Sequence, residues 1–103
     1  MYKCRTDANQ AKIVNECREA GFHVKTLGNG IIDTYMYRDD IPILFLTEIK
    51  TGKQENAYKK LTAEQKKFFD TFGKAANLML ATNTDYIIQY ANLFKEAYIR
   101  KEF

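Results

Sequence analysis

The chain has 103 residues, of which 46% are hydrophobic and 28% charged, and these values predict one globular domain over residues 1–103 with a modest core. Its net charge of +3 is too small to identify a nucleic-acid-binding protein. No apolar run approaches the roughly 18 residues of a membrane-spanning helix, and the polar N-terminus lacks the apolar centre of a signal peptide. We therefore expect a cytoplasmic protein without a membrane partner, in which Cys4 and Cys17 are reduced thiols.

The first predicted element is a helix over residues 8–20. Asp7 is a suitable N-cap for it, and apolar residues recur through it at helical spacing, with Cys17 on the stripe that the core would bury. Gly21 suits the position just after a helix end. Residues 22–27 then predict a strand, followed by a loop that contains two glycines.

The centre of the chain predicts a pair of antiparallel strands. The runs 31–37 and 42–49 are rich in β-branched and aromatic residues and flank a short polar patch. We expect a loop over residues 39–42, which pairs Arg38 with Ile43.

Continued along both strands, this register places Asp33 directly opposite Glu48. Lys50 lies two residues beyond Glu48 and therefore on the same face, because strand side chains alternate with period two. Two carboxylates at such a separation repel each other, and a divalent cation with a preference for oxygen ligands would relieve the conflict. A Glu-x-Lys pattern alone also fits a solvated strand edge, but the unbroken apolar run over residues 43–46 predicts a strand covered on both faces.

The second half of the chain predicts a helix, a strand and a helix. Thr62 and Gln65 have the spacing of a capping box at the start of the first of these helices. We expect that helix to end at Gly73 and to bury three aromatic residues, Phe68, Phe69 and Phe72. A strand over residues 76–81 and a helix reaching about residue 101 complete the order α-β-β-β-α-β-α, which predicts an α/β fold with a mixed four-stranded sheet flanked by helices.

Covalent acyl chemistry has little support in the sequence. The chain contains no serine, and neither cysteine has an evident neighbouring base, which disfavours covalent acyl transfer. A group of lysines follows the carboxylates, namely Lys53, Lys59, Lys60, Lys66 and Lys67. Such a group fits a contact surface for DNA phosphates, and it also fits a solvated helix face.

These motifs, in this order, resemble the PD-(D/E)XK nuclease superfamily. The resemblance rests on the pattern RTDANQxxIVxxxRxxG from Arg5, on GxxD ending at Asp33, on ExK ending at Lys50, and on KLTxxQ ending at Gln65. It extends from Arg5 to about Ile88 and is nearest to the small stand-alone phage and prophage nucleases related to the virus-type replication-repair (VRR-NUC) group. It implies a restriction-endonuclease-like core in a bacterial or phage-infected cell.

The resemblance also implies roles for individual residues. Asp33 and Glu48, with the backbone carbonyl of Ile49, would bind Mg²⁺ or Mn²⁺. Lys50 would orient or activate the attacking water, and Gln65 would lie near the site, although Gln65 also fits a capping residue alone. The sequence departs from the motif at Ile32, where the family pattern has proline.

On the first helix, Asn9 or Glu16 stands where many family members place a further polar or acidic residue. Some relatives have a glutamate where this chain has Asn9 and Gln10, so the number of metal ions stays open. The expected function is a metal-dependent DNA endonuclease in phage or mobile-element DNA processing, with branched DNA such as four-way junctions as a candidate substrate. The alternative is a catalytically inactive nuclease-fold protein that binds nucleic acid or regulates another phage protein.

A homodimer is the expected assembly. In the last helix we expect one apolar stripe to face the core, namely Ile87, Tyr90, Ala91, Phe94 and Tyr98. Further apolar residues remain outside that stripe, namely Tyr86, Ile88, Leu93, Ala97, Ile99 and Phe103. Exposed apolar patches tend to mark interfaces, and a symmetric dimer would bury the same patch twice.

Overall fold

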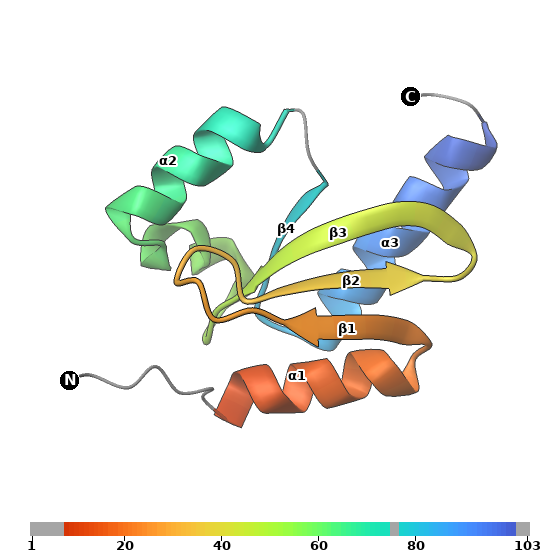
Figure 1. The fold of residues 1–103 in the computed structure, drawn as a ribbon, viewed down its shortest axis with the longest axis horizontal. Coiled ribbons are helices and arrows are strands. Elements are labelled where there is room, and N and C mark those ends of the chain that lie inside the picture. The colour runs from red at the N-terminus through yellow and green to blue at the C-terminus, as the bar shows by residue number, and fades with distance from the viewer. Residues whose placement is uncertain (1–7, 75–76, 101–103) are drawn as a thin grey trace.

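The computed structural model describes residues 8–74 and 77–100 and has the expected order of elements (Figure 1). These are α1 (Ala8–Glu19), β1 (Phe22–Thr26), β2 (Thr34–Arg38), β3 (Ile41–Ile49), α2 (Ala63–Phe72), β4 (Leu78–Ala81) and α3 (Thr84–Ile99), with two short 3₁₀ turns, Gln54–Asn56 and Tyr58–Lys60, before α2. The predicted cap Asp7, together with Cys4, Ala76, Lys101 and Phe103, lies outside the described residues. In the described ranges no helix combines the length and apolarity that crossing a membrane requires.

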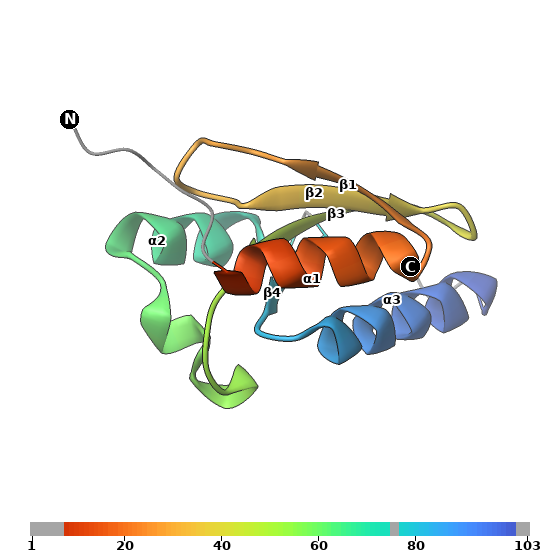
Figure 2. The same ribbon diagram turned by 90° about the horizontal axis from the view of Figure 1, so that it is seen from below.

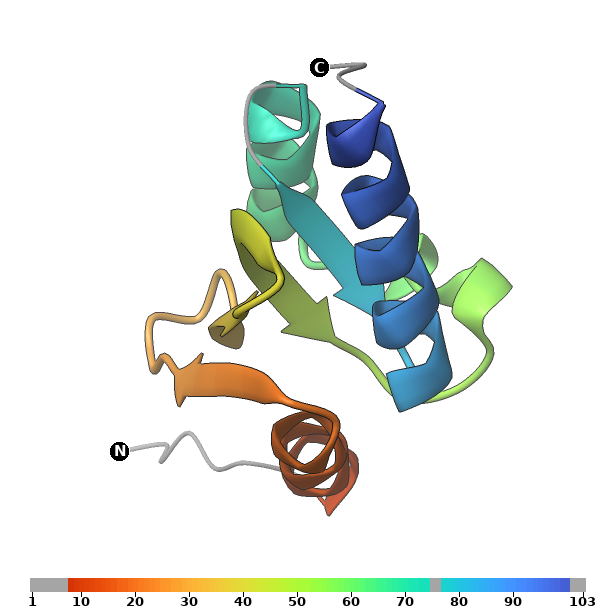
Figure 3. The ribbon, with the colours of Figure 1, turned by 90° about the vertical axis from the view of Figure 1, so that its right-hand side faces the viewer.

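The four strands form one mixed sheet in the order β1-β2-β3-β4. The first two pairings are antiparallel and the β3–β4 pairing is parallel, so the chain crosses from β3 to β4 through α2. Helices α1 and α3 lie on the same side of the sheet (Figure 2), with α3 alongside β4 (Figure 3). Helix α2 stands apart from them at the end of the sheet where β3 ends (Figure 1). The predicted α/β fold with a mixed, helix-flanked sheet is therefore confirmed.

The core lies between the sheet and the helices α1 and α3. Ile13 from α1, Ile87 from α3, and Met36 and Phe45 from the strands are almost completely buried. The rings of Phe45 and Phe94 meet edge to face at 5.4 Å between centroids.

Cys17 is fully buried and packs in this core. Burial, and to a smaller degree the charge of Glu16, raises the pKa of its thiol to about 11. The thiolate is therefore scarce at neutral pH.

The β2–β3 connection differs from the predicted loop. Arg38 pairs with Ile41, so the chain turns on two residues, 39 and 40, and the predicted Arg38–Ile43 pairing is wrong. A bulge between Tyr37 and Arg38 then accommodates two extra residues of β3, one of which is Pro42. Proline has no backbone N–H to give to a ladder, and a bulge is where a strand tolerates it.

The bulge restores the register that the longer loop would have produced. Thr34 pairs with Thr47 and Tyr37 with Leu44, as expected from the sequence. The turn itself is held by Asp40, which accepts from Arg38 Nε at 2.6 Å and from Lys95 Nζ at 2.9 Å.

Helix α2 is buried less than its three phenylalanines suggest. Phe68 and Phe69 are half-buried and Phe72 is 48% exposed, so the prediction that α2 buries all three is wrong. The rings contact one another instead, with Phe68 and Phe72 at 5.0 Å between centroids. The residue that α2 does bury is Gln65, in the first turn of the helix, where it bonds to Glu48 of β3.

The sheet face away from α1 and α3 is only partly covered. Leu44 is 49% exposed and Leu46 is half-buried, whereas Phe45, which points to the other face, is buried. The expectation that residues 43–46 form a strand covered on both faces is therefore wrong. The apolar run is unbroken, but α2 covers the second face only near Glu48.

Helix α3 buries its predicted stripe except at the C-terminal end. It also packs Tyr86 and Ile88 against the core, so the prediction that these two lie outside the buried surface is wrong. Ile87 and Ala91 are buried, and Tyr90 and Phe94 pack against the core. Tyr98, expected on the buried stripe, is 49% exposed. Strand β4, alongside which α3 runs, has four residues against sixteen in the helix, so it is too short to cover the last turn of α3.

Thr47 provides a test of the packing. Its side chain is fully buried and, among the described residues, its hydroxyl has no hydrogen-bond partner. We expect Thr47→Val to raise the free energy of unfolding by about 1 kcal/mol, because an unpaired buried hydroxyl is destabilising.

The matched control is Thr34→Val. Thr34 is equally buried, but its hydroxyl donates to the Thr47 carbonyl at 3.3 Å, so this substitution should destabilise the protein. Urea denaturation measures both, and a Thr47→Val variant less stable than the wild type would contradict the assignment.

Candidate active site

Two carboxylates face each other where β2 begins and β3 ends. Asp33 immediately precedes β2, and Glu48 is the last residue but one of β3. The Asp33 backbone N–H donates to Glu48 Oε1 at 3.1 Å, and the Ile49 backbone N–H donates to Asp33 Oδ2 at 2.9 Å. Each carboxylate is thus held by the backbone next to the other, which fixes both side chains.

Glu48 is the buried member of the pair, with only 3% of its surface exposed. Its Oε2 accepts from Gln65 Nε2 at 2.8 Å and lies 3.2 Å from Lys50 Nζ. Burial, followed by the negative charge of Asp33, raises the pKa of Glu48, although the contacts with Gln65 and Lys50 act in the opposite direction. The folded environment therefore disfavours the charged form of Glu48, chiefly because the carboxylate is buried.

Gln65 connects the start of α2 to this pair through all of its amide hydrogen-bonding positions. Its Nε2 donates to Glu48 and, at 3.0 Å, to the Ile31 carbonyl. Its Oε1 accepts from Lys50 Nζ at 3.2 Å and from the Thr62 backbone N–H at 3.0 Å. The two roles that the sequence left open are therefore compatible, since the same side chain closes the capping box and contacts the carboxylate.

Lys50 lies between the carboxylates and the surface. Its side chain is 20% exposed, and its backbone N–H donates to the Ala81 carbonyl of β4 at 2.9 Å. The ammonium group is held by Glu48 and Gln65 and stays partly open to solvent beside the pair.

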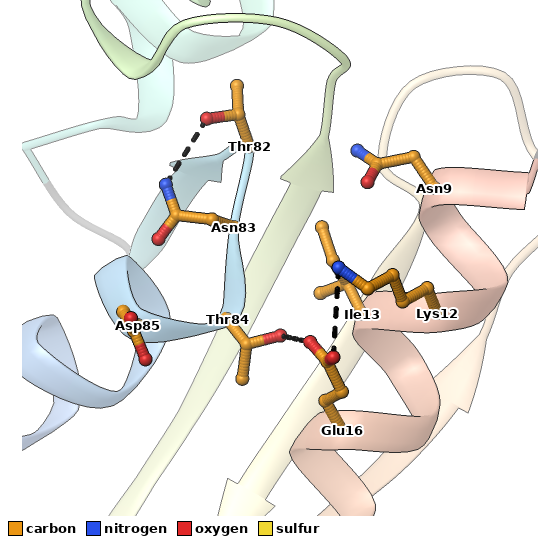
Figure 4. A pocket seen from close by; sticks show the side chains of 8 residues that line it. All are labelled: Asn9, Lys12, Ile13, Glu16, Thr82, Asn83, Thr84 and Asp85. Carbon is orange, nitrogen blue, oxygen red and sulfur yellow. Dashed lines mark hydrogen bonds and ion pairs between the residues drawn. The ribbon is translucent and has the colours of Figure 1, made fainter.

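The two candidates on α1 have different positions. Asn9 Nδ2 donates to the Lys50 carbonyl at 3.1 Å, which brings the start of α1 to the backbone of the site. Glu16 instead accepts from the Thr84 hydroxyl and pairs with Lys12 (Figure 4). It connects α1 to α3, and no contact with Asp33 or Glu48 is seen within the described residues.

A polar hollow of about 340 Å³ separates α1 from the start of α3 (Figure 4). Asn9 lies at one end of it and Glu16 at the other. Its lining comes from α1 and from the turn into α3, namely Asn9, Lys12, Ile13, Glu16, Thr82, Asn83, Thr84 and Asp85. The two carboxylates of the pair are not part of this lining.

Gln54 is a supporting residue that the sequence does not reveal. Its Nε2 donates to the Leu80 carbonyl at 2.7 Å, and its Oε1 accepts from the Thr82 backbone N–H at 2.9 Å. These bonds attach the segment after Lys50 to β4. A single polar residue in a polar segment carries no pattern that could have predicted this.

The five predicted DNA-binding lysines fall into two groups. Lys60 Nζ donates to the Thr51 carbonyl, and Lys66 Nζ lies 5.6 Å from the centre of the Tyr58 ring. The other three, Lys53, Lys59 and Lys67, are exposed.

No protein-family model, curated protein or solved structure matches this chain. Within the described ranges, no group of three or more His, Cys, Asp or Glu side chains is placed to hold a metal ion. Asp33 and Glu48 are a group of two, so further ligands to an ion at this position would be backbone carbonyls, water or substrate oxygens.

The repulsion between the carboxylates predicts an unusual effect of Asp33→Asn. Without divalent cations, we expect this variant to be as stable as the wild type or more stable, because the Asn oxygen can still accept from Ile49 N–H while the charge near Glu48 disappears. Urea denaturation in EDTA measures this. A loss of more than about 1 kcal/mol, the usual value of a lost hydrogen bond, would contradict it.

The same variant has a signature in pH. A glutamate whose pKa in the folded protein is raised above its ordinary value of 4.5 binds its proton more tightly when folded, so stability falls as the pH rises above 4.5 and through the raised pKa. In Asp33→Asn that fall should be smaller. Asp85→Asn, at an exposed acid in the first turn of α3, is the control and should leave the fall unchanged.

Proposed function

We propose that this chain is a Mg²⁺- or Mn²⁺-dependent DNA endonuclease with a PD-(D/E)XK core, related to the VRR-NUC group. The observation that supports this best is the facing pair of Asp33 and Glu48 in contact with Lys50 and Gln65. These four residues stand at the four positions to which the resemblance assigns site roles. The mixed sheet, in which α2 connects the parallel strands β3 and β4 along the chain, agrees with a core of this type.

The donor set fits a hard divalent cation. Both side chains offer carboxylate oxygens, which Mg²⁺ and Mn²⁺ prefer, and Mg²⁺ often binds one or two carboxylates together with waters and substrate phosphates. Burial, followed by the charge of Asp33, raises the pKa of Glu48, and a bound cation would favour the ionised carboxylate. Asp33, Glu48 and the Ile49 carbonyl would hold the ion, which when bound would polarise a phosphoryl oxygen and acidify a water.

The protein's own residues supply the rest of the proposed chemistry. Lys50 presents an ammonium beside Glu48 and is partly exposed, so it can hold the attacking water or stabilise the charge that develops on phosphate. Gln65 positions both Glu48 and Lys50 through its two amide atoms. Asn9 stabilises the backbone after Lys50, so it acts as a positioning residue.

Ile32 fixes the backbone next to Asp33. It stands where the family motif has proline, and only 4% of its surface is exposed. Its N–H and that of Ile31 donate to Asn29 Oδ1 at 3.0 and 2.9 Å, which closes the turn before Asp33. A buried apolar residue in a fixed turn gives Asp33 a defined position without proline.

An inactive nuclease-fold protein that binds nucleic acid or regulates a phage partner is the second candidate. It has no need for the facing carboxylates, because a repelling pair with one buried member lowers stability without serving binding. The contacts that hold the pair in place therefore favour an enzyme.

A homodimer is part of the proposal, and α3 is its proposed interface. Leu93 and Ile99 are 66% and 65% exposed, and Tyr98 is 49% exposed. A hollow of about 270 Å³ beside them is lined by Tyr90, Leu93, Phe94 and Ala97. An apolar surface of this kind can be buried twice by a symmetric dimer, which would supply two sites for two cuts.

Activity and metal binding should separate in a defined way among variants. We expect Asp33→Asn and Glu48→Gln to abolish Mn²⁺-dependent DNA cleavage and to weaken Mn²⁺ binding in a calorimetric titration. Lys50→Met should retain Mn²⁺ binding but lose roughly 100-fold or more in rate, the usual effect of removing a donor to developing charge.

Lys74→Met, at an exposed lysine after α2, is the matched control and should behave as the wild type. Branched, nicked and single-stranded DNA are the substrates to compare. Undiminished Mn²⁺ binding by both carboxylate variants would refute the metal assignment, and wild-type cleavage by Lys50→Met would make Lys50 structural.

The exposed lysines should account for the salt dependence of DNA binding. Each phosphate contact contributes about 0.9 to the slope of log affinity against log salt on duplex DNA. We expect a triple Gln variant of Lys53, Lys59 and Lys67 to reduce this slope more than a double variant of Lys60 and Lys66, whose ammonium groups already contact Thr51 and Tyr58. An unchanged slope in the triple variant would place the DNA on another face.

A further inference from the structure

One face of the sheet remains open beside the candidate site. On β1, β2 and β3 it consists of two rows of paired residues, with Lys25, Tyr35 and Leu46 in one and His23, Tyr37 and Leu44 in the other. We call these six residues the open face. Tyr35 is 36% and Leu44 49% exposed, and His23 and Lys25 are also exposed. Figure 2 shows α1 and α3 on the opposite side of these strands.

The open face continues directly into the candidate site. Asp33, Tyr35 and Tyr37 are alternate residues along one strand direction, and so are Leu44, Leu46 and Glu48. Alternate residues share a face, so the carboxylates lie at one end of the same surface that carries the tyrosines. A strand of nucleic acid whose phosphate reaches Asp33 and Glu48 can therefore extend over Tyr35.

The spacing on this face suits bases that are not stacked on one another. Alternate residues of a strand stand about 6.6 Å apart, whereas stacked bases follow one another at about 3.4 Å. A nucleotide chain laid along β2 with one nucleotide per alternate residue has its bases too far apart to stack together. Aromatic rings on the sheet then take the place of the neighbouring bases, as they do in proteins that bind single strands.

The chemistry of the face agrees with this occupant. Lys25 is directly paired with Tyr35, which sets a cation for the backbone beside a ring for the base. His23 and Tyr37 already stack at 6.0 Å between centroids with 23° between their planes, and His23 Nε2 contacts Asp39 Oδ1 at 2.9 Å. Leu44 and Leu46 add apolar surface beside these rings. Paired bases inside a duplex do not expose their flat faces, so only unpaired nucleotides can use these rings.

We propose that the open face binds unpaired nucleotides next to the phosphodiester bond that the site cleaves. This inference rests on the proposed nuclease function and names its substrate class as nucleic acid with a single-stranded segment. The ring of Tyr35, exposed and nearest in sequence to Asp33, is the principal stacking platform.

Fluorescence anisotropy in EDTA tests the proposal without cleavage. The probes are a labelled oligothymidine of roughly 12 nucleotides, within the usual range for such surfaces, and a blunt duplex of the same length. The wild type should bind the unpaired probe more tightly than the duplex. Tyr35→Thr should weaken binding of the unpaired probe by roughly five-fold or more, whereas Tyr35→Phe, which keeps the ring, should bind as the wild type does.

The matched control is Phe72→Ala at the end of α2. Phe72 is at least as exposed as Tyr35, at 48% against 36%, but lies on another element and outside the proposed dimer interface, so its loss should not change the affinity. A folded Tyr35→Thr variant that binds like the wild type overturns the proposal. Equal wild-type affinity for duplex and unpaired probes also overturns it, and this comparison needs no variant.

Two further outcomes show which of the two proposals fails. Binding that depends on the Tyr35 ring, without Mn²⁺-dependent cleavage, supports the open face and overturns the proposed nuclease function. Mn²⁺-dependent cleavage with binding that does not depend on the ring supports the nuclease function and overturns the proposal for the open face. Light scattering adds one more outcome. If the protein is a dimer that Leu44→Glu dissociates but the oligonucleotide does not, the open face is a dimer interface, and the proposal is overturned as well.

Discussion

The burial of the Glu48 carboxylate beside Asp33 is the constraint on which the rest of the site depends. A carboxylate with 3% exposure is costly unless its oxygens are bonded. Here a backbone N–H, an amide and an ammonium approach it from three different segments of the chain. Burial, followed by the charge of Asp33, nevertheless raises the pKa of Glu48. In the proposed function, a bound cation would stabilise the charged form of this carboxylate.

The same constraint explains the placement of α2. This helix contributes little apolar burial, since Phe72 is exposed and Phe68 is half-buried. Its attachment to the sheet is mainly polar and is concentrated in Gln65, whose side chain closes the capping box and bonds to Glu48. Helix formation and site assembly therefore use the same residue. Loss of that side chain would disturb the helix start and the carboxylate together.

The two faces of the sheet differ in their physical role. One packs against α1 and α3 and contains the core residues Met36 and Phe45. The other carries Glu48 at one end and the partly exposed Tyr35 and Leu44 beyond it. Because successive side chains of a strand alternate, β2 and β3 support the core and the site with the same backbone. The Cys17 thiol of α1 packs in the core on the first face, and burial raises its pKa.

Local patterns determined the elements of this protein. Helical spacing and the Thr62–Gln65 capping box placed the helices, and period-two alternation placed Asp33 and Glu48 on one face in a register that depends on the turn between their strands. Only the tertiary structure decided the two-residue turn with its bulge, the exposure of Phe72 and Leu44, and the connection of Glu16 to Thr84 in place of the site. The physical reason is that periodicity specifies the face on which a side chain stands, whereas the neighbour that covers that face comes from a distant part of the chain.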